Sequence, residues 1–293
     1  MTDAVLNSAP VRSGSRIRSR AVRRFLKHRP AVVALCILVV FGLVAIFAPL
    51  IAPYDPIKSD FLAIRQPPSA LHWMGTDELG RDLLSRLIYG TRTSLMAGVV
   101  PVALALAISI PLGLLSGYVG GFLDSVLMRF TDALLAIPFL VLAIALTALL
   151  GPGLFNAMLA IGIAAIPIFL RLARGSALAV SKEDYIEAAR AGGNSPLRIA
   201  FKHVLPNMIP PLFVQATLTV ATAIIVEASL SFLGLGQRPP APSWGSMLNE
   251  AQRFLPTLPT MALWPGLAIF IVVMSINIVG DGIRDAMDPR HKS

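Results

Sequence analysis

Long apolar stretches without charged side chains recur along this chain. Residues 31–54 and 93–123 carry no charge, and the uncharged stretch 133–170 is too long for a single membrane crossing. A helix needs about 20 apolar residues to cross a bilayer, and Gly151-Pro152-Gly153 has the turn chemistry that divides the third stretch in two. Two more apolar stretches follow. The pattern therefore predicts six membrane-spanning helices, at residues 31–52, 93–117, 127–149, 155–173, 208–233 and 260–281.

The composition agrees with an all-α integral membrane protein. The chain has 293 residues, of which 55% are hydrophobic and 14% charged, whereas soluble domains carry about 25% charged residues. The one cysteine, Cys36, lies inside the first apolar stretch, so no disulfide can form within the chain. We interpret Cys36 as a packing residue.

The distribution of basic residues predicts the orientation. With a cytoplasmic N-terminus, most of the 25 Lys and Arg residues fall in cytoplasmic segments, and the outer segments hold only Lys58, Arg65, Arg81, Arg86, Arg92, Arg238 and Arg253. The positive-inside rule then places both termini in the cytoplasm. The expected organisation is a basic cytoplasmic tail (1–30), a first span (31–52), an extracytoplasmic segment with an amphipathic helix (53–92), a five-helix core (93–281) and a cytoplasmic tail (282–293).

One cytoplasmic segment, residues 181–207, is charged and broken by glycine. Ser181 is expected to cap a short helix, with Asp184 three residues later, and Gly192-Gly193 to end it. Ser195 and Pro196 have the pattern that begins a second helix. The apolar positions of this second helix recur at helical spacing; they are Leu197, Ala200, Phe201, Val204 and Leu205. Pro206-Asn207 is expected to end the pattern.

This helix–turn–helix has two interpretations. It is either a solvated connector or a projection that fits a groove on a cytosolic partner, which is a common mode of recognition. Small residues at Ala188, Ala189 and Gly193 would let the surface of a partner approach closely.

The same segment resembles the EAA loop of binding-protein-dependent ABC importer permeases. That motif reads E-A-A, three residues, G, nine residues, I-x-L-P, and here Glu187-Ala188-Ala189, Gly193 and His203-Val204-Leu205-Pro206 match it. His203 departs from the isoleucine of the general pattern. A histidine followed by V-L-P-N is similar to the dipeptide/oligopeptide/nickel branch, as are the G-T-D-E-L-G-R-D sequence at 75–82 and the E-A-S-L-S-F-L-G-L-G sequence at 227–236.

The resemblance implies a type I ABC importer permease fold in the inner membrane. It implies that the loop is a coupling helix seated in an ATPase subunit, with the coupling residues Glu187, Ala188, Ala189, Gly193, His203, Leu205 and Pro206. The implied partners are a second permease, two cytoplasmic ATPases that bind ATP and Mg, and an extracytoplasmic binding protein. The implied solute is a di- or oligopeptide, with nickel or another small solute as the alternative.

The outer segment between the first two spans suggests a helix capped by Thr76. Asp77 and Glu78 would occupy its first turn, where acids suit the helix dipole, and leucines at 79, 83, 84 and 87 with Ile88 would form its apolar face. Asp77, Glu78 and Asp82 could suggest a metal site. The nearby Arg81 and Arg86 favour neutral ion pairs instead, so no metal site is predicted.

Two acidic residues fall inside predicted spans. Asp132 follows Arg129 by three residues, a spacing that allows an ion pair, and Glu227 lies within the fifth span. Intramembrane acids are candidate functional residues, but without an intramembrane histidine partner they would form a poor proton relay. We therefore expect Asp132 and Glu227 to serve the helix core or the translocation pathway. In the outer loop 237–260, Arg238 and Trp244 are candidates for contact with a binding protein.

The sequence contains no motif for catalysis. It has no Walker A motif, no G-x-S-x-G and no H-E-x-x-H, so we expect a non-enzymatic subunit without a cofactor of its own, whose energy comes from partner ATPases. The rival from another class is a secondary transporter driven by an ion gradient, which typically has repeated halves and broken helices. A membrane enzyme would need a nucleophile and a base, and the sequence offers no such set. A role as a structural scaffold stays open.

Overall fold

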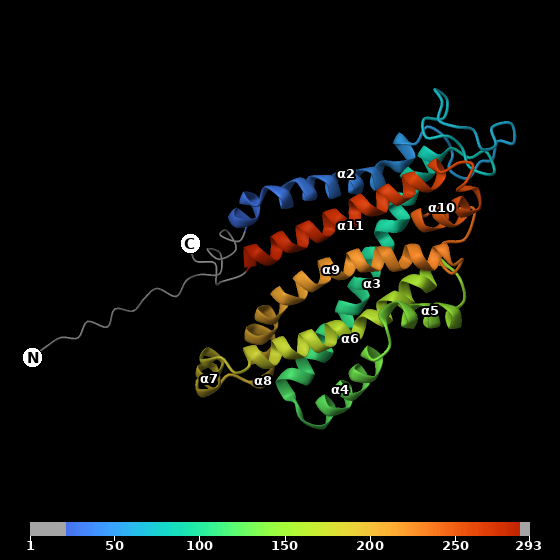
Figure 1. Cartoon of the computed structure of the whole chain (residues 1–293). Helices are drawn as coiled ribbons and strands as arrows, with labels where there is room; N and C mark the ends of the chain where they lie inside the picture. Colours follow the sequence, from blue (N-terminus) through green and yellow to red (C-terminus); the bar gives the residue numbers. More distant parts are fainter. Residues whose placement is uncertain (1–21, 288–293) are drawn as a thin grey trace, which may run out of the picture.

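A computed structural model describes residues 22–287, and the regular elements within that range are helices (Figure 1). Five helices are long and apolar enough to cross a membrane: α2 (Arg29–Ile51), α3 (Leu83–Val119), α6 (Leu154–Val180), α9 (Leu205–Phe232) and α11 (Thr260–Met287). A sixth crossing is formed by α4 (Gly121–Leu135) and α5 (Phe139–Leu150) when this bent pair is counted as one. Three shorter α-helices are α7 (Asp184–Ala191), α8 (Pro196–Ile199) and α10 (Trp244–Ala251).

The third predicted span is not a straight helix. The prediction of one helix over 127–149 is wrong, because α4 and α5 meet at an angle of 94°. The break lies at Ile137 and Pro138, the latter being the N-cap of α5. Proline disfavours helical geometry in the residue before it and has no backbone N–H to donate, so the chain turns there.

The outer helix predicted from Thr76 is also wrong. The chain from Thr76 to Asp82 forms a turn closed by a β-bridge between these two residues. Asp82 is the true N-cap, since its carboxylate accepts a hydrogen bond from Ser85 N at 2.8 Å, and the helix then continues as α3 for 37 residues. The hydroxyl of Thr76 is used elsewhere, where it donates to Ala63 O and accepts from Gln66 N.

The main core lies between α3, α6 and α9. Small residues let α3 and α6 approach closely, because a side chain at Gly113 would collide with Ala173 and one at Gly117 would collide with Ala177. Such small-residue contacts are typical of helix packing in membranes. The hydrophobic effect does not drive helices together there, so close van der Waals packing does. The close α3–α6 pair sets the positions of α7 and α8, which follow directly on α6.

The two ends of the helix bundle differ. The start of α2, the end of α11 and the helices α7 and α8 lie together at one end, which we call the α7 end (Figure 1). Residues 52–82 and α10 lie at the other, which we call the α10 end (Figure 1). The basic tail residues Arg12, Arg16, Arg18, Arg20, Arg290 and Lys292 lie outside the described residues.

Candidate functional site

The segment that matches the EAA pattern begins with α7, at the α7 end. Its N-cap is Glu183, whose backbone is extended (φ −75°, ψ 142°) as an N-cap requires. The expectation that Ser181 caps this helix is wrong. Ser181 has helical backbone angles and closes α6 instead, with its hydroxyl donating to Ala177 O at 2.6 Å.

The end of α7 is built from the two glycines, as the sequence predicts. Gly192 donates its N–H to Ala188 O at 2.9 Å, and Gly193 takes a left-handed conformation with φ +77°. Asn194 then donates both its backbone and side-chain N–H groups to Ala189 O. Only glycine adopts this conformation without a steric cost, so Gly193 fixes the turn between α7 and α8.

The second short helix begins as predicted and ends differently. Ser195 Oγ accepts a hydrogen bond from Arg198 N, with Pro196 in the first turn. The expectation that Pro206-Asn207 interrupts the helix is wrong, because a π-helical segment (Ala200–Val204) joins α8 to α9. Pro206 falls in the first turn of α9, where its missing N–H is tolerated, and Asn207 Nδ2 donates to the carbonyl of His203 at 2.7 Å.

The predicted coupling residues fall on an exposed surface around α7. Ile186 is fully buried and anchors α7 to the main core. Glu187, Ala188, Gly193 and Pro206 are exposed, whereas Ala189, His203 and Leu205 are half-buried. The segment thus packs through one side and presents the other.

The apolar stripe predicted in the second helix divides into two parts. Ala200 and Val204 are buried in the main core, but Leu197 and Phe201 are 72% and 62% exposed. Two large apolar side chains exposed in the segment that follows α7 are typical of an interaction surface. The sequence pattern did not distinguish them from core residues, because the π-helical segment rotates the faces.

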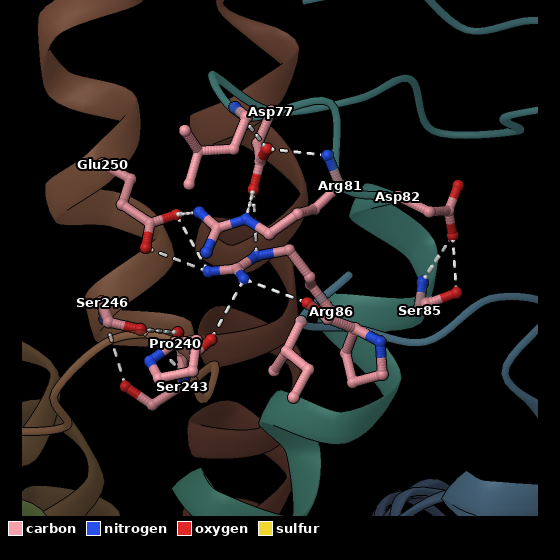
Figure 2. A network of polar contacts seen from close by, with 12 residues as sticks. Asp77, Arg81, Asp82, Ser85, Arg86, Pro240, Ser243, Ser246 and Glu250 are labelled. Carbon is pink, nitrogen blue, oxygen red and sulfur yellow. Dashed lines mark hydrogen bonds and ion pairs between the residues drawn. The ribbon is translucent and has the colours of Figure 1, made fainter. Parts of the chain in front are cut away.

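A buried polar network occupies the α10 end (Figure 2). Asp77 Oδ2 contacts Arg81 Nε at 2.6 Å and Arg86 Nε at 3.3 Å. Glu250 of α10 accepts from Arg81 Nη2 and Arg86 Nη2, each at 2.9 Å. Arg86 Nη1 also donates to the carbonyls of Pro56 and Pro240. Two arginines and two carboxylates thus bring residues 53–82, α3 and α10 together.

The predicted ion pairing with Arg81 and Arg86 is confirmed for Asp77 but not for Asp82. Glu250 was missed because nothing near it in the sequence signals the contact. Burial raises the pKa of the Glu250 carboxyl, and the charges of Arg86 and Arg81 oppose that shift. Asp82 lies apart from this network and contacts His72 Nδ1 at 3.0 Å. Within residues 22–287, no group of three or more His, Cys, Asp or Glu side chains is placed to hold a metal ion.

The two intramembrane acids have different surroundings. The pairing of Asp132 with Arg129 is wrong, because Asp132 contacts Arg171 of the neighbouring helix α6. Both members of that pair are more than half exposed. Glu227 is fully buried and accepts a hydrogen bond from Ser231 Oγ at 2.7 Å, so it belongs to the core.

The candidate binding-protein contacts also differ from each other. Arg238 is exposed at the α10 end. The interpretation of Trp244 as a docking residue is wrong, because its side chain is fully buried. Its Nε1 donates to Leu87 O at 3.3 Å and its ring packs edge-on against Phe41, so it joins α10 to α2 and α3.

Two family models match the chain. Residues 109–293 match the "Binding-protein-dependent transport system inner membrane component" model. Residues 18–68 match the "N-terminal TM domain of oligopeptide transport permease C" model.

Curated relatives match over nearly the full length. The dipeptide transport system permease protein DppC of Alkalihalophilus pseudofirmus is 45% identical over 93% of this chain and 90% of the relative. The glutathione transport system permease protein GsiD of Pectobacterium atrosepticum is 43% identical over 92% and 90%. The probable D,D-dipeptide transport system permease protein DdpC of Escherichia coli is 46% identical over 90% and 89%.

Solved structures share the fold. An inward-facing MetNI methionine ABC transporter aligns with a TM-score of 0.56, at 22% identity, over 70% of this chain and 98% of that chain. At that identity the likeness concerns the arrangement of helices and not the solute.

Proposed function

This chain belongs to the family of binding-protein-dependent transport system inner membrane components, and we propose that it carries short peptides inward, driven by ATPase subunits that act on α7. It is an inner-membrane permease subunit of an ABC importer with the type I fold. Relatives of this kind are membrane subunits and not enzymes, so the proposal places ATP and Mg on partner chains.

The geometry of α7 carries the coupling proposal. This short helix is anchored by Ile186, ends at the fixed turn of Gly193 and exposes Glu187 and Ala188. The π-helical segment and α9 follow without interruption, so a displacement of α7 and α8 would act on the α9 rod directly. Rigid-body movement of packed helices is a common form of transport transition.

The direction of the chain in the membrane is part of the proposal. Lys182, Arg190, Arg198 and Lys202 all lie at the α7 end, and the positive-inside rule assigns such an end to the cytoplasm. The ATPases would then dock at the α7 end. A solute-binding protein would dock at the α10 end, where Arg238 is exposed.

The names of the relatives support peptides as the solute. Those relatives are described as permeases for dipeptides, glutathione and D,D-dipeptides. Dipeptides are short peptides, and glutathione is a tripeptide that carries a thiol. We therefore propose that the pathway formed with a second, homologous permease takes short peptides.

Reconstitution tests this function. The chain, its partner permease and two ATPases would be assembled in liposomes with the binding protein, and uptake of a radiolabelled dipeptide measured with and without ATP. We expect uptake only with ATP and an intact ATPase site. Peptide accumulation driven by a proton gradient without ATP would support the secondary-transporter alternative, and no uptake of any peptide would remove the peptide proposal.

A further inference from the structure

An exposed ion pair joins α4 to α6, close to the predicted cytoplasmic ends of the spans 127–149 and 155–173. Arg171 lies nine residues before the end of α6, about 14 Å from the α7 end at 1.5 Å per residue. Its Nη2 contacts Asp132 Oδ1, and the two side chains are 54% and 61% exposed. Charges facing lipid are costly and rare, so this face is turned toward water or another polar surface.

The neighbouring ion pair shows the contrast. Arg174 donates to both carboxylate oxygens of Asp124, at 2.5 and 2.7 Å, and Ser116 donates to the same carboxylate. That pair is largely covered, with side-chain exposures of 32% and 17%. Among the described residues, Asp132 accepts a hydrogen bond only from Arg171, so one carboxylate oxygen remains for a ligand.

A hollow of about 580 Å³ opens beside the exposed pair. Its lining combines Arg171, Ser176 and Gln215 with the apolar side chains of Leu135, Ile168 and Leu172. Pockets for small molecules typically measure about 300–1,000 Å³ and combine apolar walls with a few polar groups. The size and the mixed lining suit a small polar ligand, and Asp132 adjoins the hollow through its contact with Arg171 without lining it.

We propose that this hollow and the adjoining Asp132 bind a short zwitterionic peptide during its passage, with the peptide carboxylate at Arg171 and its ammonium at Asp132. The inference rests on the proposed function and adds a site to it. Asp132 and Arg171 neutralise each other when no peptide is bound. In the complex, the peptide ammonium would replace Arg171 as the partner of Asp132, and the peptide carboxylate would replace Asp132 as the partner of Arg171. Because the arginine side chain is long and flexible, the pair can separate without movement of the helices.

A cysteine at position 175 would report on occupancy. Gly175 lines the hollow, and a Cβ there would meet nothing within 4 Å, so Gly175→Cys should fold normally. The complete complex, with Cys36→Ala as the background, would be placed in nanodiscs and treated with a cationic thiol reagent. Modification at position 175 would be followed by mass spectrometry with and without alanyl-alanine. The exposed Ser125→Cys on α4, which does not line the hollow, is the control for reagent loss.

We expect alanyl-alanine to slow modification at Gly175→Cys about tenfold when present at roughly ten times its dissociation constant, with no effect at Ser125→Cys. The separate charges can be tested with blocked peptides. Asp132→Asn should remove protection by C-amidated alanyl-alanine, which keeps only its ammonium. Arg171→Gln should remove protection by N-acetylated alanyl-alanine, which keeps only its carboxylate. A purely structural ion pair would not produce this selectivity.

Arg129→Gln is the matched charge control, because Arg129 is exposed on α4 and does not line the hollow. It should leave protection by all three peptides unchanged. A cysteine at 175 that does not react, or that reacts equally with and without the peptides, would overturn the inference. ATP-driven dipeptide uptake by the Cys36→Ala complex separates the two levels. Uptake without protection of the cysteine at position 175 would contradict this site alone. Absence of uptake would contradict the proposed function.

Discussion

Arg86 and Glu250 stand 164 positions apart in the sequence, yet Arg86 Nη2 donates to both carboxylate oxygens of Glu250, at 3.0 and 2.9 Å. The contact joins the start of α3 to α10 inside the network that also holds Asp77 and Arg81 (Figure 2). Because the network is buried, removing one of its charges leaves another buried charge without a partner, which costs more than at a surface ion pair.

Glu250→Gln should therefore destabilise the protein strongly. The change leaves two buried arginines to share the one carboxylate of Asp77, and removing a partner from a buried pair typically costs about 3–5 kcal/mol. Thermal unfolding of the detergent-purified chain would measure the loss. Glu78→Gln makes the same chemical change on a half-buried residue next to Asp77, in the turn 76–82, and should shift the midpoint little. Equal shifts for the two variants would contradict the importance of the network.

Gly193→Val should uncouple transport from ATP hydrolysis. The left-handed backbone of Gly193 (φ +77°) costs an ordinary L-residue about 1–2 kcal/mol, so the turn would rearrange and displace α7 relative to α8. The measurement is the number of peptides taken up per ATP hydrolysed by the reconstituted complex, which should fall. Gly192→Ala is the control, since Gly192 has φ −74° and its new Cβ would meet nothing closer than 3.4 Å. Unchanged coupling in Gly193→Val would count against the role of this turn.

Substitutions at Leu197 and Ile199 should distinguish an effect on docking from an effect on folding. The two residues lie two positions apart on α8 but differ in exposure. Leu197 is 72% exposed and Ile199 is buried in the core. Leu197→Ala should weaken binding of the ATPase subunits by roughly tenfold, which corresponds to about 1.4 kcal/mol, at an unchanged melting temperature. Ile199→Ala should instead lower the melting temperature, because a core cavity costs about 2–5 kcal/mol. If Leu197→Ala left ATPase binding intact, the exposed apolar surface would not be the docking site.

The sequence predicted the features that depend on local chemistry. The glycine turn at 192–193 and the cap at Ser195 follow from residue types a few positions apart, and both are confirmed. The apolar stretches likewise gave the crossing count, with five long helices and one bent pair. These features require no knowledge of which helices pack together.

The errors concern tertiary contacts and competition between nearby alternatives. Asp132 had Arg129 on its own helix, but Arg171 reaches it from α6, and only the packing of two helices decides between them. Tryptophan is common at membrane interfaces, yet α10 folds back and buries Trp244 against Phe41. Thr76 and Asp82 are both good caps, and the turn between them selected Asp82.

The orientation of the chain can be tested with single cysteines in the Cys36→Ala background. Leu62 belongs to the segment 52–82 of the α10 end and is 93% exposed, and Lys182 is exposed between α6 and α7. In spheroplasts, Leu62→Cys should react with a membrane-impermeant thiol reagent, because the positive-inside rule places the α10 end outside. Lys182→Cys should react only after permeabilisation. The Cys36→Ala parent should stay unlabelled under both conditions, which shows that the signal comes from the introduced thiols. Labelling of Lys182→Cys alone in sealed spheroplasts would invert the topology and move the proposed ATPase surface to the wrong side of the membrane.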